Sequence, residues 1–273
     1  MKMIHFFASD LDGTFLKQDK TYNHAYFAQV LAEIQRQNGH FVIATGRDID
    51  MIRRDFAPFI GQVDLVVDNG ALVETADQKR LQQAAVPTPL MAQAMMLINQ
   101  MELTKGVIMV GLTGKYMLKA HRKMGAVNDE FQRLVHVTKY IDDLDEIDEP
   151  IVKLTFGINA AETETCMHLM AAELGTNVHV TTSGYGSIDI VAQGVNKADG
   201  IAKLAEYYQI SASQLMAFGD GKNDLEMLQL ANEPRAMANG DQDIMQKFPL
   251  ALADNEHDGV LKTIEAYLQN KGI

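Results

Sequence analysis

Two aspartates separated by one residue follow the first apolar stretch of the chain. The stretch Ile4–Ser9 runs directly into Asp10-Leu11-Asp12-Gly13-Thr14. Side chains two residues apart on an extended segment point the same way, so both carboxylates face one direction. Carboxylates held side by side repel each other, and a cation beside them relieves this repulsion. The segment predicts either a divalent-cation site with a carboxylate available for chemistry or an ordinary acidic turn.

A hydroxyl and a glycine follow the second apolar stretch. Phe41–Ala44 leads into Thr45-Gly46-Arg47, and a helical pattern comes next. A threonine hydroxyl followed by an unobstructed backbone amide suits the oxygens of a phosphate. The alternative is a simple strand-to-helix turn in which Thr45 caps the helix.

A lysine stands at the start of a later helical pattern. Gly194-Val195-Asn196-Lys197 opens the pattern that continues to Tyr208. A lone lysine is usually a solvated surface charge. A helix N-terminus disfavours a cation, however, so this position is unusual unless an anion lies nearby.

Further carboxylates follow the apolar run Leu215–Phe218. The segment Gly219-Asp220-Gly221-Lys222-Asn223-Asp224 places Asp220 at a strand end and Asp224 in the first turn of a helix. A strand-to-helix turn capped by Asn223 or Asp224 explains one acidic residue. It does not explain the second one at the edge of the sheet.

The elements that must carry these residues are short apolar runs that alternate with helical patterns. Continuous apolar runs of this length are typical of strands buried on both faces of a parallel sheet. The predicted strands are Ile4–Ser9, Phe41–Ala44, Leu65–Val67, Leu215–Gly219 and Leu250–Ala253. The predicted helices between and after them are Asn23–Asn38, Ala198–Tyr208 and His257–Leu268. This alternation predicts an α/β fold with a doubly wound, mostly parallel, Rossmann-like sheet.

The middle of the chain has a different pattern. From about Ala84 to Gly186, candidate strands mix with two helical stretches, Leu90–Met101 and Ala161–Leu174. Pro87 and Pro89 mark the entry and Ser183–Gly186 the exit. The sequence therefore predicts a core formed by residues 1–83 and 187–273, with an α+β domain of residues 84–186 inserted as a cap.

Composition narrows the possible partners. The chain has 273 residues and a net charge of −12, which disfavours nucleic acid and anionic membranes as partners. A phosphorylated substrate remains compatible, because a metal and one lysine make a local positive pocket. The single cysteine, Cys166, excludes an internal disulfide and a thiolate metal site. No apolar run is long enough for a membrane span or a secretory signal, so a cytoplasmic location is expected.

Together the four motifs resemble the haloacid dehalogenase superfamily, and within it the Cof-type, sugar-phosphatase-like branch with a large α/β cap. The matching stretches are Asp-x-Asp-Gly-Thr, Thr-Gly-Arg, Gly-Val-x-Lys and Gly-Asp-x-x-Asn-Asp, with Asn69-Gly70-Ala71 and Asn255–Leu261 in addition. The resemblance covers nearly the whole chain. It implies a Mg²⁺-dependent phosphatase acting on a small phosphorylated metabolite, and it does not fix the substrate.

The resemblance also implies roles for individual residues. Asp10 is the expected nucleophile, Asp12 the general acid and base, and Lys197 the catalytic cation. The expected Mg²⁺ ligands are Asp10, the Asp12 main-chain carbonyl and Asp220, with Asp224 orienting Lys197 or a metal-bound water. The expected phosphate-binding residues are Leu11, Thr45, Gly46, Lys197 and Asn223, and the expected substrate contacts are Arg47 and Asn69.

Two other functions remain open from the sequence, and a third is disfavoured by the length of the chain. A phosphomutase uses the same aspartyl phosphate but returns the phosphate to a sugar. A non-catalytic sensor of phosphorylated metabolites would use the same scaffold, although it would not need both Asp10 and Asp12. A receiver-type signalling domain also combines an aspartate, a threonine and a lysine, but it is far shorter and has no cap. The sequence carries no information on the oligomeric state.

Overall fold

The structure, a computed structural model, describes residues 3–101, 106–123, 136–183 and 186–271. Within these residues the chain divides into two compact units. The first comprises Met1–Thr45, Phe56–Gln82 and Asn196–Ile273, and the second comprises Gly46–Asp55 and Gln83–Val195. Gly184 and Tyr185, part of the predicted exit segment, lie outside the described residues.

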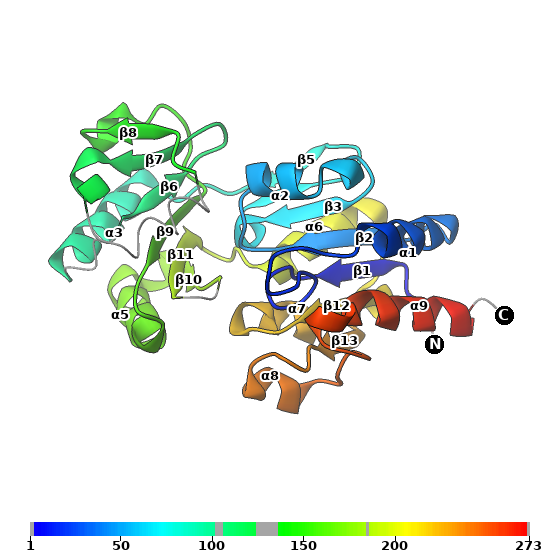
Figure 1. Cartoon of the computed structure of the whole chain (residues 1–273). Coiled ribbons are helices and arrows are strands. Elements are labelled where there is room, and N and C mark those ends of the chain that lie inside the picture. Colours follow the sequence, from blue (N-terminus) through cyan, green and yellow to red (C-terminus); the bar gives the residue numbers. More distant parts are fainter. Residues whose placement is uncertain (1–2, 102–105, 124–135, 184–185, 272–273) are drawn as a thin grey trace. The chain divides into compact units, whose positions relative to one another are not determined.

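The first unit is built on a twisted sheet whose strands run mostly parallel (Figure 1). Its order is β13-β12-β1-β2-β3-β4-β5, and β4 pairs antiparallel with β3. The strands are β1 (Phe6–Ser9), β2 (His40–Ala44), β3 (Asp64–Val67), β4 (Leu72–Glu74), β5 (Arg80–Gln83), β12 (Leu215–Gly219) and β13 (Glu233–Ala236).

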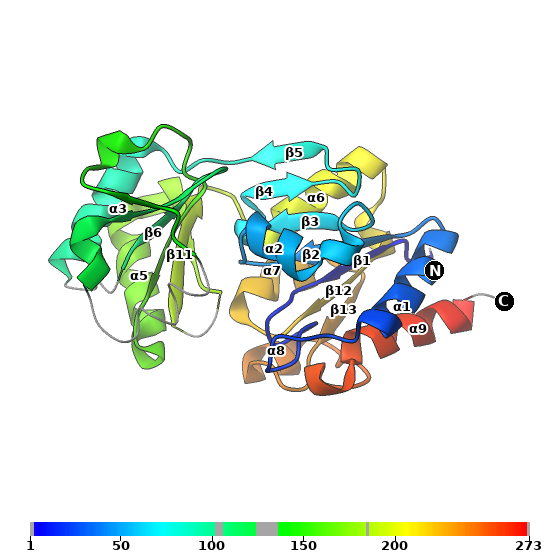
Figure 2. The same cartoon turned by 45° about the horizontal axis from the view of Figure 1, so that its top comes forward.

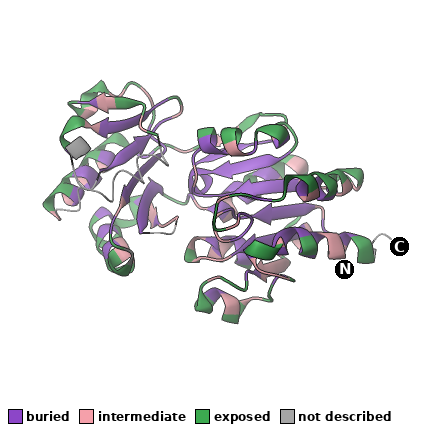
Figure 3. Cartoon of the chain, in the orientation of Figure 1, coloured by how far each residue is buried: buried purple, intermediate pink, exposed green. Residues whose placement is uncertain are grey.

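Helices cover both faces of this sheet (Figure 2). They are α1 (His24–Arg36), α6 (Lys197–Tyr208), α7 (Leu225–Leu230), α8 (Gln242–Lys247) and α9 (Gly259–Lys271). On one face α1 contacts β2 and α9, and on the other α6 contacts β2, β3, β4 and α7. The buried side chains of α1 are Phe27, Val30, Leu31 and Ile34, at the spacing of one helical face. Apolar strands therefore sit between two helical layers, and Figure 3 shows them as buried.

The register of the parallel strands brings their carboxyl ends together. Ser9 of β1 pairs with Phe218 of β12 on one side and with Ile43 of β2 on the other. The residues that follow these three strands thus emerge at the same edge of the sheet, which is where open α/β sheets bind ligands.

The second unit is a mostly antiparallel sheet with two longer helices. Its strand order is β10-β11-β9-β6-β7-β8, and β7 and β8 run parallel. Its elements are α2 (Ile49–Asp55), α3 (Thr88–Gln100), β6 (Ile108–Val110), β7 (Lys115–Leu118), β8 (Lys139–Ile141), β9 (Lys153–Gly157), α5 (Thr163–Leu174), β10 (Val178–Thr181) and β11 (Ser187–Ala192). The helices α3 and α5 contact each other, and their apolar residues share one core with β6, β7, β9 and β11.

The predicted fold class is confirmed: a doubly wound, mostly parallel α/β sheet is combined with an inserted α+β unit. The units differ from the predicted boundaries at residues 46–55, at Gln83 and at residues 187–195, which group with the second unit. Residues 187–195 group there because β11 pairs with β9 and β10.

One predicted strand is wrong. Leu250–Ala253 forms only an isolated bridge, between Leu250 and Ala236 at the end of β13. Leu250 and Leu252 are exposed, so this apolar segment lacks the burial on both faces that its pattern suggested. No helix in the described part of the chain is both long and apolar enough to cross a membrane.

Candidate active site

Predicted site residues of the first unit lie at the carboxyl edge of its sheet. Asp10 directly follows β1, Thr45 follows β2 and Asp220 follows β12. The strand pairing extends one step into these residues, because the Asp10 amide donates to the Phe218 carbonyl at 3.0 Å. The backbone that carries the nucleophile candidate is thus fixed by the sheet itself.

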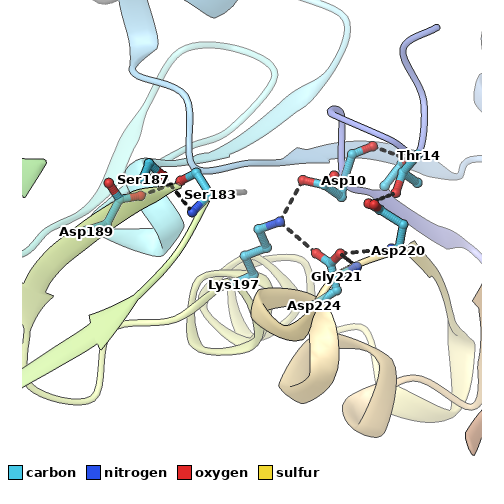
Figure 4. A network of polar contacts seen from close by, with 10 residues as sticks. Asp10, Thr14, Ser183, Ser187, Asp189, Lys197, Asp220, Gly221 and Asp224 are labelled. Carbon is cyan, nitrogen blue, oxygen red and sulfur yellow. Dashed lines mark hydrogen bonds and ion pairs between the residues drawn. The ribbon is translucent and has the colours of Figure 1, made fainter. Parts of the chain in front are cut away.

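A buried lysine joins two of the carboxylates. Lys197 Nζ lies 2.6 Å from Asp10 Oδ1 and 2.6 Å from Asp224 Oδ1, and the lysine side chain is 1% exposed (Figure 4). Lys197 is the first residue of α6, whose N-cap Asn196 accepts a hydrogen bond from the Asp199 amide at 2.8 Å. The two carboxylates supply the anions that a lysine at a helix N-terminus requires.

The electrostatics of this cluster favour an additional cation. Burial, together with repulsion from Asp224 and Asp220, raises the pKa of Asp10 well above its usual value, although Lys197 opposes the shift. Burial and repulsion from Asp224 raise the pKa of Asp220 to about 6. Burial alone would lower the pKa of Lys197, but Asp10 and Asp224 raise it above the ordinary value. Lys197 therefore leaves negative charge in the cluster uncompensated.

The carboxylates are spaced to hold a metal ion. Asp10, Asp220 and Asp224 each offer one oxygen, and these oxygens lie within 4.8 Å of one another. A set of hard oxygen donors with excess negative charge suits Mg²⁺, which is often bound through one or two carboxylates and otherwise by water and phosphate oxygens. The donor set thus fits the expected ion.

The loops after β1 and β12 interlock at this point. Thr14 Oγ1 donates to Asp220 Oδ1 at 2.8 Å, and Asp224 Oδ2 accepts from the amides of Asp220 and Gly221 at 3.0 and 3.1 Å. Gly13 has a φ of +83°, and a Cβ there would lie 2.4 Å from Asp220 Oδ2. Glycine is therefore required for the first loop to approach Asp220.

Three of the residues predicted to contact phosphate or substrate lie on loops of the same unit. Thr45 is buried, and its carbonyl accepts a hydrogen bond from the Asn69 amide at 3.0 Å. Asn69 is buried with a left-handed φ of 56°, and a Cβ on the following Gly70 would lie 2.2 Å from the Asn196 carbonyl. The Asn69-Gly70 turn is thereby packed against the residue that precedes Lys197. Asn223 is half-buried, directly before Asp224.

Gly46 and Arg47 belong to the second unit. There the Gly46 carbonyl accepts a hydrogen bond from Lys153 Nζ at 2.6 Å, and Arg47 Nη1 lies 3.0 Å from Asp55 Oδ2. In the first unit, the Leu11 side chain is fully buried and its carbonyl accepts from the amides of Thr14, Phe15 and Leu16. The assigned roles of these residues in binding phosphate and substrate stay predictions.

Three contacts of the first motif are not evident from the sequence. Thr14 received no role, although its hydroxyl holds Asp220. Asn239 Nδ2 donates to the Gly13 carbonyl at 2.7 Å, and Lys20 Nζ lies 2.7 Å from Asp12 Oδ1. Thr14 belongs to the motif itself, so its hydroxyl could have been predicted to bind a neighbouring carboxylate. No local pattern points to Asn239 or Lys20.

A buried lysine among carboxylates, at the carboxyl edge of a parallel sheet, is typical of an enzyme that handles an anionic group with the help of a cation. A statistical model of the haloacid dehalogenase-like hydrolases matches residues 7–264. The chain therefore belongs to the haloacid dehalogenase-like hydrolase family, as its motifs predicted.

Similar proteins span nearly the whole chain. The 5-amino-6-(5-phospho-D-ribitylamino)uracil phosphatase YbjI of Escherichia coli is 27% identical, with 98% of this chain and 97% of the relative covered. The phosphatase YitU of Bacillus subtilis, which has the same activity name, is 28% identical over 95% of this chain and 96% of the relative. The crystal structure of SMU.1108c from Streptococcus mutans superposes with a TM-score of 0.89 at 27% identity, covering 97% and 99% of the two chains.

Proposed function

We propose that this protein is a Mg²⁺-dependent phosphatase that hydrolyses a small phosphomonoester through an aspartyl phosphate on Asp10. The observation that carries the proposal is the pairing of Lys197 Nζ with Asp10 and Asp224, at 2.6 Å from each, beside Asp220. The proposed nucleophile, a compact cation and the proposed metal ligands thus lie at one sheet edge. Phosphoryl transfer needs chiefly such positioning and charge stabilisation.

The proposed reaction has two halves. The Asp10 carboxylate forms a bond to phosphorus while the ester P–O bond breaks, and Asp12 gives its proton to the leaving oxygen. Asp12 then takes a proton from water as the water oxygen bonds to phosphorus and the bond between Asp10 and phosphorus breaks, which releases phosphate and restores the Asp10 carboxylate. The ammonium of Lys197 stabilises the charge that spreads over the phosphoryl oxygens.

The Asp10 and Asp220 carboxylates and the Asp12 main-chain carbonyl would hold Mg²⁺, with Asp224 beside them. When bound, the ion supplies further neutralisation of the phosphoryl charge. Burial and the neighbouring carboxylates raise the pKa values of Asp10 and Asp220, and a bound cation would favour their ionised forms, which supports this assignment.

The proposed substrate class is a small phosphorylated metabolite, and a phosphorylated ribityl compound is a specific candidate. The activity named for the relatives in E. coli and B. subtilis supports this candidate. We further propose that the second unit selects the leaving group. If residues 83–195 are exchanged for the matching segment of another family member, the preferred substrates should change while the Mg²⁺ requirement stays. Unchanged preferences would reject this role.

The function is tested by measuring phosphate release from a library of phosphomonoesters, including the phosphoribitylaminouracil compound, with Mg²⁺ present. We expect release with Mg²⁺, loss with EDTA and recovery when Mg²⁺ is added in excess. Asp10→Asn should abolish release while its melting curve shows a folded protein. Transfer of the phosphate to a second sugar, with little free phosphate, would instead identify a phosphomutase.

A further inference from the structure

The second carboxylate of the first motif has a charged partner. Lys20 Nζ lies 2.7 Å from Asp12 Oδ1, and the side chains of Lys20 and Asp12 are 35% and 20% exposed. Eight positions separate the two residues, so the contact depends on the path of the loop between them.

The loop that presents Lys20 is fixed by its own turn and by a distant segment. Lys20 has a left-handed φ of 66°, a conformation that costs free energy in a residue other than glycine and persists only where the surroundings enforce it. The Lys20 amide donates to the Lys17 carbonyl, and the Lys17 amide donates to the Thr21 carbonyl, each at 2.9 Å. Asn255 Nδ2 anchors the loop from outside through the Leu16 carbonyl at 2.9 Å.

The backbone around Asp12 is held in place as well. Asp12 forms an isolated backbone bridge with Leu16, and the next carbonyl, that of Gly13, accepts from Asn239 Nδ2 at 2.7 Å. Asn239 also accepts from the Asn255 amide at 3.3 Å. Asn239 and Asn255 therefore tie the two stretches of backbone, one carrying Asp12 and one leading to Lys20, to the same C-terminal region.

We propose that Lys20 is a positioning residue that orients the Asp12 carboxyl group for proton transfer to the leaving oxygen. The proposal rests on the proposed function, in which Asp12 is the general acid. A general acid acts only within hydrogen-bond reach of its target, and small displacements in such a site cost large factors in rate. A lysine that holds one carboxyl oxygen from a fixed turn limits the rotation of the Asp12 side chain.

The role of Lys20 is tested by comparing two substrates whose leaving groups differ in how much they need a general acid. Nitrophenolate departs with little protonation, whereas phenolate gains more from a general acid. We expect Lys20→Met to lower kcat/KM for phenyl phosphate by roughly tenfold, a part of the hundredfold or more that a general acid supplies, and to change that for 4-nitrophenyl phosphate by less than about twofold. The ratio kcat/KM is the correct quantity, because it reports the steps up to departure of the leaving group. Lys20→Arg should retain part of the activity that Lys20→Met loses. Lys17→Met, which removes a charge from the same loop, is the control and should keep the wild-type ratio of kcat/KM for the two substrates.

Two results would overturn the proposal. One is an unchanged ratio of the two kcat/KM values in Lys20→Met, whether neither value falls or both fall equally. The other is a Lys17→Met variant with the same effect as Lys20→Met. Lys20→Gln serves as the second variant if Lys20→Met is not folded. A double variant with Asp12→Asn should show no further effect of Lys20→Met, since Lys20 acts through Asp12. Failure of the proposed function is distinguishable, because then Asp10→Asn retains activity or Asp12→Asn itself leaves the ratio unchanged.

Discussion

Lys197 and Asp10 form an ion pair of 2.6 Å across 187 positions of sequence. The strand β1 delivers the carboxylate and the first turn of α6 delivers the ammonium, and both groups are buried. Burying an ion pair is costly unless further partners satisfy the charges. Here Asp224 shares the lysine at the same distance, so the arrangement is a charged site built into the core rather than a surface contact.

Loss of the lysine should disable the enzyme without unfolding it. Lys197→Ala removes a fixed charge contact of the kind typically worth ~3–4 kcal/mol in the transition state, so kcat/KM should fall on the order of a hundred- to a thousandfold. Lys203→Ala, at an exposed position of the same helix, is the matched control and should keep wild-type kinetics. Steady-state kinetics measure kcat/KM of both variants, and melting curves show whether each variant is folded. Near wild-type kcat/KM in folded Lys197→Ala would reject the site described above.

Crowding at Gly13 should affect both stability and activity. Gly13 and Gly61 both have positive φ, at +83° and +90°, but only the Cβ of an alanine at position 13 meets other atoms, those of Asp220. Gly61→Ala should therefore cost about 1 kcal/mol of unfolding free energy from backbone conformation alone, with activity intact. Gly13→Ala should cost more and should lower kcat/KM at least roughly tenfold through displacement of Asp220. Denaturant unfolding and kinetics measure both effects, and equal behaviour of the two variants would contradict the close packing at Gly13.

Neutralising Asp220 should stabilise the metal-free protein while abolishing turnover. The folded pKa of about 6 lies above the ordinary value of 3.8, so the folded state binds the proton more tightly than the unfolded state does. The ionised Asp220 carboxylate therefore lowers the free energy of unfolding. This loss of stability is absent below about pH 4, develops as the pH rises through about 6, and is complete above it. Asp220→Asn should thus raise the unfolding free energy by about 1–3 kcal/mol at neutral pH.

The measurement is denaturant unfolding of metal-free protein across this pH range. The gain from Asp220→Asn over wild type should shrink as the pH falls toward 4. Asp243→Asn, at an exposed position of α8, is the control and should show little change at any pH. A gain that is independent of pH, or a loss at neutral pH, would contradict the electrostatic description of the cluster.

The sequence predicted the positions of those site residues that come directly after a buried strand. Asp10, Thr45 and Asp220 were predictable because parallel strands in register end at one sheet edge, and an apolar run reveals such a strand. Elements without that pattern were missed. The edge strand β13 reads Glu-Pro-Arg-Ala, which carries no apolar run. The strand β11 was not predicted, and its residues were placed in the core, whereas β11 pairs with β9 and β10.

The contacts between distant loops were also beyond local pattern. Asn239 and Gly13 are separated by 226 positions, and their hydrogen bond depends on how the C-terminal segment folds back on the first loop. The ion pair of Lys20 with Asp12 depends on a left-handed turn at a lysine, which amino-acid preference does not predict. Both contacts follow from tertiary packing.

The central claim is that the phosphoryl group passes through Asp10, and trapping the intermediate tests it most directly. The enzyme is mixed with 4-nitrophenyl phosphate and Mg²⁺, quenched in acid within the first turnover, digested and analysed by mass spectrometry. Wild type and Asp12→Asn should both carry a phosphoryl group on the peptide that contains Asp10, with more in Asp12→Asn because its hydrolysis step lacks the base. Asp10→Asn should carry none and release no nitrophenolate. Turnover by Asp10→Asn, or a phosphoryl group on a different residue, would contradict the account.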